Sequence, residues 1–82
     1  KHVKYPQIAL ENGVQGKVFV QFVVEKDGSV SNIKVVRGVD ASLDKEAVRV
    51  VSVMPKWKPG KQRGKAVRVA YTLPIAFQIG SY

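Results

Sequence analysis

Apolar and polar residues alternate with a period of two in three stretches of the chain, a pattern that predicts β-strands with one buried face. The first stretch covers residues 17–25 and the second covers residues 30–37. Asp27 and Gly28 lie between them, and glycine accepts the positive φ of a tight turn, so the sequence predicts a β-hairpin. The positions expected to face the core are Val18, Val20, Phe22, Val24, Ile33 and Val35.

The third alternating stretch, residues 67–79, predicts a strand of about twelve residues, which is long for a small domain. Pro74 lies within it, and because proline has no amide hydrogen, one side of the strand lacks a hydrogen-bonded neighbour there. We therefore expect this strand at an edge of the sheet. Its apolar face is expected to carry Val67, Val69, Tyr71, Leu73, Ile75, Phe77 and Ile79.

Two segments have the spacing of helices rather than strands. Residues 43–54 carry apolar side chains at intervals of three and four, with Asp40 or Ser42 as the N-cap and Pro55 as the stop. A shorter helical segment ends near Gly13, which is a suitable C-terminal stop. The longer helix is expected to bury Leu43, Ala47, Val50, Val51 and Met54.

The predicted order of elements is helix, strand, strand, helix, strand, which gives an α+β fold. The hairpin and the third strand form a three-stranded antiparallel sheet of order 2-1-3 if the third strand lies beside the first. Both helices then pack on one face of the sheet. The 82 residues make one domain. We expect it to span residues 5–79, after a residual linker at 1–4 and before a tail at 80–82.

The composition argues against catalysis. The chain has no cysteine and a single histidine, His2, so the usual zinc ligand sets and histidine-assisted nucleophiles are excluded. The six acidic residues fall in predicted turns, at helix starts and on solvent faces, where each has a structural role. We therefore expect a binding module, not an enzyme, with no catalytic site, no metal site and no cofactor.

The chain begins with Lys1 rather than methionine and shows no signal peptide. Its apolar runs are far shorter than the roughly 20 residues that cross a bilayer. We therefore expect a processed or excised piece of a longer protein, with any membrane anchor outside it.

The net charge of +8 is unevenly distributed, because all six acidic residues precede Ala47 while half of the 14 basic residues lie between Arg49 and Arg68. One hypothesis is nucleic-acid binding, in which cations contact phosphates and Trp57 stacks on a base. In the alternative, Trp57 packs in the core, since a small domain with one tryptophan usually buries it. The cations of the first hypothesis are Lys56, Lys58, Lys61, Arg63, Lys65 and Arg68.

A second binding hypothesis is β-augmentation, in which an extended peptide adds itself to the edge of the third strand. A long exposed edge is an aggregation hazard that proteins normally blunt, and Arg68 and Pro74 blunt this one in part. The alternatives are a protected edge without a ligand and an edge paired in a homodimer.

Five motifs follow one another in a specific order along the chain. They are Tyr5-Pro6, ENGVQGKVFVQFVVEKDGSV, Leu43-Asp44, PKWKPG at 55–60 and YTLPIAF at 71–77. Together they resemble the C-terminal domain of TonB-family proteins over nearly the whole chain, about residues 5–79. The family has the same order of helices and strands. It also carries the W-x-P-G pattern in a turn, which favours packing over ligand contact for Trp57.

The resemblance implies a periplasmic domain of a protein anchored in the bacterial inner membrane. Such a domain binds the TonB box, a short extended segment of outer-membrane TonB-dependent transporters. It transmits energy from the ExbB–ExbD motor for the uptake of siderophores, vitamins or other nutrients. An envelope protein with a TonB-like domain and a different partner is the alternative within the family.

The resemblance also implies where the peptide binds. In the family the TonB box pairs with the last long strand, and residues before the Tyr-Pro motif lie near the peptide. The peptide-binding residues carried over to this chain are Arg68, Val69, Ala70, Tyr71, Thr72, Leu73, Lys4 and Tyr5.

Overall fold

The computed structural model describes residues 3–79, so His2 and the expected tail at 80–82 lie outside the described residues. Two helices and five strands make up this part of the chain. In sequence order they are α1 (Gln7–Glu11), β1 (Gly16–Val24), β2 (Val30–Arg37), α2 (Ala41–Ser52), β3 (Gly60–Gln62), β4 (Lys65–Val67) and β5 (Val69–Phe77).

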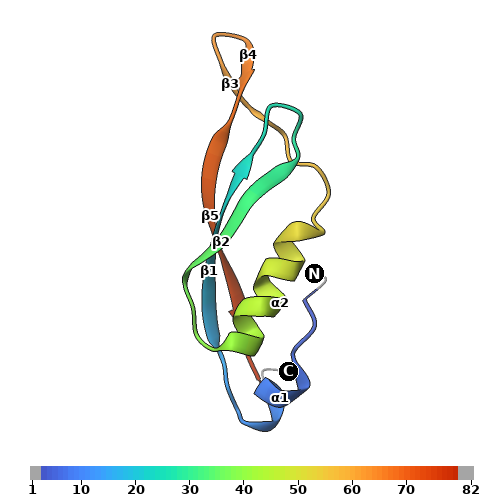
Figure 1. Ribbon diagram of the computed structural model, residues 1–82, viewed down its shortest axis with the longest axis vertical. Coiled ribbons are helices and arrows are strands. Elements are labelled where there is room, and N and C mark those ends of the chain that lie inside the picture. Colours follow the sequence, from blue (N-terminus) through green and yellow to red (C-terminus); the bar gives the residue numbers. More distant parts are fainter. Residues whose placement is uncertain (1–2, 80–82) are drawn as a thin grey trace.

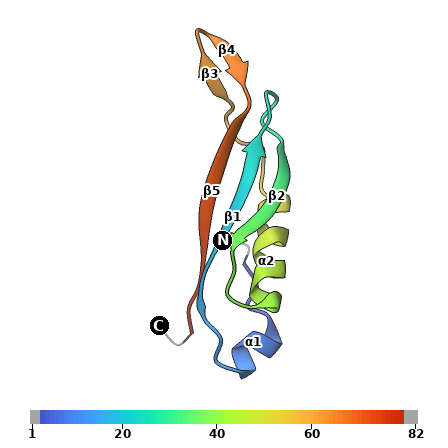
Figure 2. The same ribbon diagram turned by 60° about the vertical axis from the view of Figure 1, so that its left-hand side comes forward.

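The three long strands form an antiparallel sheet of order β2-β1-β5, and both helices lie on one face of it (Figure 2). The first and second strands form the expected hairpin, and the chain returns through α2 to place β5 beside β1. This arrangement confirms the predicted α+β fold and the predicted strand order. The second sheet contains only the short strands β3 and β4.

The core lies between the helical layer and the inner face of the sheet. All four inward residues of β1 are fully buried, as their alternation predicted, and β5 adds Ile75 and Phe77. The stripe of α2 contributes four further buried side chains. Each fully buried aliphatic or aromatic side chain stabilises the fold by about 1.5–3 kcal/mol. The buried side chains of β1 and α2 are Val18, Val20, Phe22, Val24, Leu43, Ala47, Val50 and Val51.

Helix α2 begins where its cap predicts and ends earlier than expected. The carboxylate of Asp40 accepts a hydrogen bond from the backbone N–H of Ser42 at 3.0 Å, so Asp40 is the N-cap of the two candidates. The helix ends at Ser52, and Met54 therefore lies beyond it, although its side chain still packs against the core. The helical ladder thus stops before Pro55 rather than at it.

The last predicted strand is interrupted, which corrects the expectation of one strand over residues 67–79. β4 pairs with β3 to form a separate hairpin, Arg68 follows it, and β5 begins at Val69. The turn of this hairpin holds Arg63 at φ 54° and Gly64 at φ 77°, the backbone that a two-residue hairpin turn requires. Arginine is uncommon at such a position, so the turn was not recognised in the sequence. The hairpin projects beyond the end of the long sheet (Figure 1).

Trp57 is held against the β1–β2 turn. Its backbone N–H donates to the carbonyl of Gly28 at 2.9 Å, and its ring lies 5.2 Å from that of Phe22. The side chain is half-buried and packs on the core, which confirms the packing expectation for the tryptophan. Gly28 has φ +88°, and a Cβ atom placed on it would lie 2.4 Å from the carbonyl oxygen of Trp57. The turn therefore requires glycine for both conformation and space.

We expect Gly28→Ala to lower the free energy of unfolding by about 2–5 kcal/mol. The left-handed backbone costs a non-glycine residue about 1–2 kcal/mol, and the clash with Trp57 adds about 1–3 kcal/mol. Gly13→Ala is the matched control, because Gly13 also has positive φ but its Cβ would meet no atom within 4 Å. Urea unfolding of both variants measures the difference. Equal losses of stability in the two variants would show that the Trp57 contact does not constrain the turn.

Candidate functional site

The two edges of the long sheet differ in regularity. The pairing of β2 with β1 contains two register shifts, and Asn32 has a positive φ of 51° at one of them. Such bulges bend an edge and hinder the addition of another strand. β5 instead pairs with β1 from Val69 to Phe77 in one unbroken register. The outer edge of β5 is therefore the regular one, and its place at the edge of the sheet confirms the expectation drawn from Pro74.

Pro74 divides the edge of β5 into two parts. Because proline supplies no amide hydrogen, the longer run of β5 residues with both backbone donor and acceptor is Val69–Leu73. Along this run Ala70 and Thr72 are exposed on one face of the sheet, and Val69 and Leu73 are half-buried on the other. The run thus offers an extended peptide both a hydrogen-bonding edge and two chemically different faces.

An aromatic cluster supports this part of the edge on the helical side of the sheet. Tyr71 is 37% exposed, and its ring stacks on that of Trp57 with centroids 5.6 Å apart. The centroid of the Phe22 ring lies 5.2 Å from that of Trp57 and 6.1 Å from that of Tyr71. Residues far apart in the sequence therefore fix the orientation of Tyr71 at the edge.

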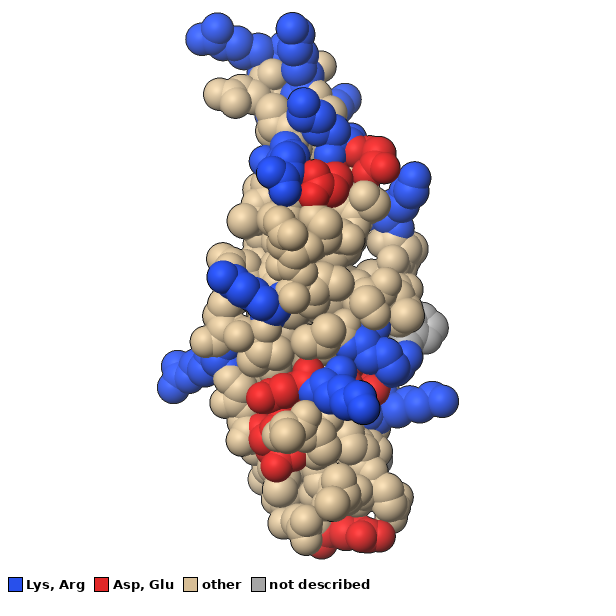
Figure 3. Space-filling model, viewed as in Figure 1, with Lys and Arg blue, Asp and Glu red and all other residues tan. Residues whose placement is uncertain are grey.

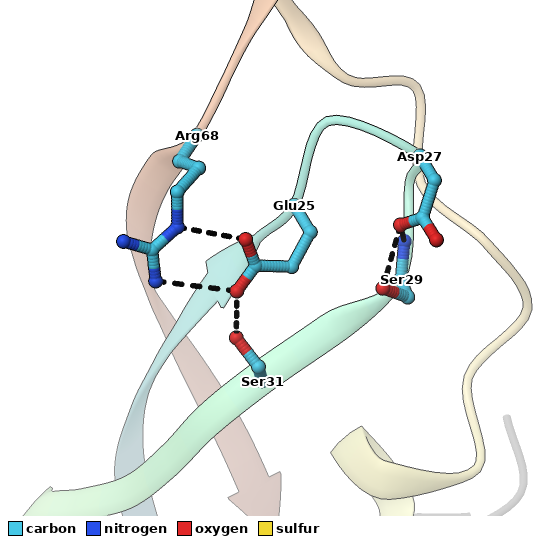
Figure 4. A network of polar contacts seen from close by, with 5 residues as sticks. All are labelled: Glu25, Asp27, Ser29, Ser31 and Arg68. Atoms are coloured by element: carbon cyan, nitrogen blue, oxygen red, sulfur yellow. Dashed lines mark hydrogen bonds and ion pairs between the residues drawn. The ribbon is translucent and has the colours of Figure 1, made fainter.

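Arg68 lies just before β5 and bonds across to the end of β1 (Figure 4). Its Nε and Nη2 atoms donate to the carboxylate of Glu25 at 2.7 and 3.2 Å. Ser31 on β2 donates to the same carboxylate. The hydrogen bonds from Arg68 and then Ser31 hold the pKa of Glu25 below its usual value. The contact of Arg68 with Glu25 thus connects the junction between the β3–β4 hairpin and β5 to the end of β1.

Lys4 and Tyr5 do not join the other predicted peptide-binding residues. The Tyr5 ring packs edge-on against Phe77, with centroids 5.5 Å apart, and its hydroxyl donates to the carbonyl of Val14. The backbone N–H of Lys4 donates to Glu46 on α2 at 2.7 Å. Phe77 ends β5, so Tyr5 lies at the opposite end of that strand from Val69–Leu73.

The basic residues of the nucleic-acid hypothesis gather at one end of the molecule, over the β3–β4 hairpin and the segment before it (Figure 3). Five of the six named cations are exposed in segments 56–58 and 61–65, and Arg68 is engaged by Glu25. The face of Trp57 that stacks on Tyr71 is already occupied. The cations therefore lie close together in the structure, but the tryptophan beside them is not freely exposed.

The sequence did not reveal the roles of Glu25 and Lys26. Both follow β1 in the turn region, and Lys26 lines the same hollow as Arg63 and Lys65. Their proximity to the hairpin depends on a turn that the sequence pattern did not predict. The signal for a charged surface in the sequence was the group of lysine and arginine residues from Lys56 to Arg68, which contains no acidic residue.

Residues 3–79 contain no group of three or more acidic or histidine side chains placed to hold a metal ion. Over the same range, no helix combines the length and apolar character needed to cross a membrane.

Comparisons with known proteins agree on one family. The family model for the Gram-negative bacterial TonB protein C-terminal matches residues 1–79. Protein TonB of Pseudomonas aeruginosa is 32% identical over 77 residues, covering 92% of this chain and 22% of the relative. Protein TonB of Yersinia enterocolitica is also 32% identical over 77 residues, covering 93% of this chain and 28% of the relative. The chain therefore spans about a quarter of the length of these curated relatives.

Two solved structures share the fold. The solution structure of the Helicobacter pylori TonB C-terminal domain, residues 179–285, is 28% identical and superimposes with a TM-score of 0.72. The match covers 98% of this chain and 72% of the Helicobacter pylori chain. The solution structure of the Pseudomonas aeruginosa TonB C-terminal domain is 27% identical and superimposes with a TM-score of 0.72. The match covers all of this chain and 83% of the Pseudomonas aeruginosa chain.

We expect the Arg68–Glu25 contact to weaken in acid. The folded-state pKa of Glu25 lies below that of the unfolded chain, so the contact stabilises the fold above the unfolded pKa. This contribution is lost as the pH falls through the lowered folded pKa, below the usual titration range of a glutamate. The NMR signal of the Arg68 Nε–H group, followed from about pH 6 to about pH 3, reports the change.

Glu25→Gln is the control for this titration, because it keeps the shape of the side chain and removes the ionisation. The Arg68 signal of the variant should stay constant over the same pH range. A wild-type signal that is also constant would mean that Arg68 is not held by the carboxylate.

Proposed function

We propose that this chain, which belongs to the TonB C-terminal domain family, binds an extended peptide by strand addition to the outer edge of β5. The observation that carries this proposal is the unbroken register of β5 next to an open edge, in contrast to the bulged edge of β2. Main-chain hydrogen bonds to Val69–Leu73 supply affinity independent of peptide side chains. Pro74 limits the paired segment on one side.

The two faces of the edge set the side-chain preferences of the peptide. Side chains on the helical side lie next to Tyr71 and Leu73, so apolar residues are favoured there. Side chains on the other face lie beside the small residues Ala70 and Thr72, which place less restriction on them. A suitable ligand is a short segment with apolar residues at every second position.

The peptide of this proposal is the TonB box of an outer-membrane TonB-dependent transporter. The domain lies in the periplasm and couples the transporter to the ExbB–ExbD motor through an inner-membrane anchor that belongs to another part of the protein. The family membership and the similarity to TonB proteins from two Gram-negative bacteria support this assignment. The domain acts by binding and pulling, without a chemical step of its own.

Titration of the labelled domain with a synthetic TonB-box peptide tests the site. We expect backbone amide shifts in Val69–Leu73 and in the partner strand β1. Two peptides N-methylated at complementary alternate residues sharpen the test, because an added strand uses the amides of only one parity. One methylated peptide should lose binding and the other should retain it.

Shifts confined to the edge of β2, or equal binding by the two methylated peptides, would overturn strand addition to β5. Light scattering of the free domain at micromolar concentration checks whether a second copy occupies the edge. A monomeric mass is expected, and a doubled mass would indicate that β5 pairs in a homodimer instead.

The rival nucleic-acid function is favoured only by the basic cluster at the hairpin. We expect weak binding to single-stranded DNA at physiological salt, because the stacking face of Trp57 is taken by Tyr71. Fluorescence anisotropy of a labelled oligonucleotide at two salt concentrations measures this. Tight binding with quenched tryptophan emission would support the nucleic-acid function instead.

A further inference from the structure

The β3–β4 hairpin lies in line with the proposed peptide-binding edge. β4 ends at Val67, Arg68 follows, and β5 begins at Val69, so the chain runs from the hairpin directly into the edge (Figure 1). Gly60 of β3 packs closely against the start of β5, because a Cβ atom on it would lie 2.5 Å from a methyl group of Val69. A peptide that pairs with Val69–Leu73 and continues past Val69 therefore reaches the hairpin.

The hairpin and its surroundings are strongly basic. An open hollow of about 630 Å³ lies beside the hairpin and is lined by side chains that include Lys26, Arg63, Lys65 and Arg68. Lys61 is exposed on the same hairpin, and the positive charges stand together at this end of the molecule (Figure 3). The positive potential of so compact a cluster attracts carboxylates.

The acidic residues near the hollow are already engaged. Glu25 accepts two hydrogen bonds from Arg68, and Asp27 accepts from the backbone N–H and hydroxyl of Ser29 (Figure 4). Of the two ion pairs within the described residues, one is internal to α2 and the other uses Arg68. Lys26, Lys61, Arg63 and Lys65 take part in neither. These four cations are therefore available to an acidic ligand.

We propose that the β3–β4 hairpin binds acidic residues that flank the added strand on the side of Val69. The proposal rests on the proposed function, since it requires a peptide on β5, and it adds a chemical requirement outside the paired segment. The flank contributes ion pairs with exposed lysine and arginine side chains, each of which is weak and screened by salt. Several together favour ligands with an acidic run at one end.

The position of the hairpin makes the requirement directional. A peptide antiparallel to β5 places its C-terminal end beside Val69, whereas a parallel peptide places its N-terminal end there. Acidic residues at one end of the ligand then meet the hairpin, and the same residues at the other end extend past Phe77. The end that improves binding therefore reports the orientation of the added strand.

The test uses one TonB-box peptide in three forms. The first carries a short run of glutamates before the box, and the second carries the same run after it. The third carries glutamines in place of the glutamates. We expect one glutamate form to bind roughly three- to tenfold more tightly than the glutamine form in low-salt calorimetry, and the other to change little. Raising the salt concentration should remove most of the gain.

Two double variants identify the cations responsible. Lys61→Gln with Lys65→Gln should remove about half of the gain in binding free energy, because Lys26 and Arg63 remain, and should leave the affinity for the glutamine form unchanged, because both side chains are exposed and outside Val69–Leu73. Lys34→Gln with Lys45→Gln removes the same charge from exposed positions on β2 and α2, and should preserve the gain.

An equal gain from glutamates at both ends would overturn the proposal, because it would indicate attraction to the overall positive charge. No gain at either end, with the glutamine form still shifting the amides of Val69–Leu73, would overturn it and leave the proposed function intact. If no form binds to β5, the proposed function and this inference fail together.

Discussion

The burial of one face of β1 between two hydrogen-bonded neighbours is the constraint on which the rest of the structure depends. Its four inward side chains have no exposed surface, and the strand pairs with β2 on one side and β5 on the other. A shift of one residue in the pairing would turn a whole set of side chains to the wrong face, so the register is strongly specified. The position of every residue along the edge of β5 follows from its partner on β1.

The sheet thus presents two edges of different quality. β2 covers one side of β1 through an irregular ladder in which Asn32 adopts a left-handed conformation. β5 covers the other side through a regular one and leaves its own outer edge straight. A straight edge invites both a specific ligand and unwanted association. Pro74 shortens the vulnerable segment, and the basic hairpin beside Val69 adds like-charge repulsion between copies of the chain.

The sequence predicted the parts of the fold that depend on periodic burial. The alternation in β1 and β5 and the helical stripe of α2 identified the core, and Pro74 identified the edge strand. The β3–β4 hairpin was missed because its turn places Arg63, rather than asparagine or aspartate, in the left-handed region. The bulge at Asn32 was missed because an alternating pattern carries no signal for an extra residue.

The candidate site was predictable in part, for a related reason. Val69–Leu73 belong to a periodic strand, so their common edge follows from the pattern together with the resemblance to a known family. The ion pair of Arg68 with Glu25 joins residues 43 positions apart, and its existence depends on the register of β1 and β5. Tyr5 was separated from the other residues by its contact with Phe77, which no local pattern encodes.

The direction of β5 has a mechanical consequence. The strand runs along the longest dimension of the molecule, whose extents are 49 × 23 × 17 Å (Figure 1). Hydrogen bonds in an antiparallel ladder lie perpendicular to the strands. Tension along the long axis therefore loads the bonds between β1 and β5 simultaneously in shear, whereas tension across it would open them one after another from an end. A peptide paired with β5 would share this geometry, so its hydrogen bonds to the strand would resist tension most strongly when the pull is along the strand.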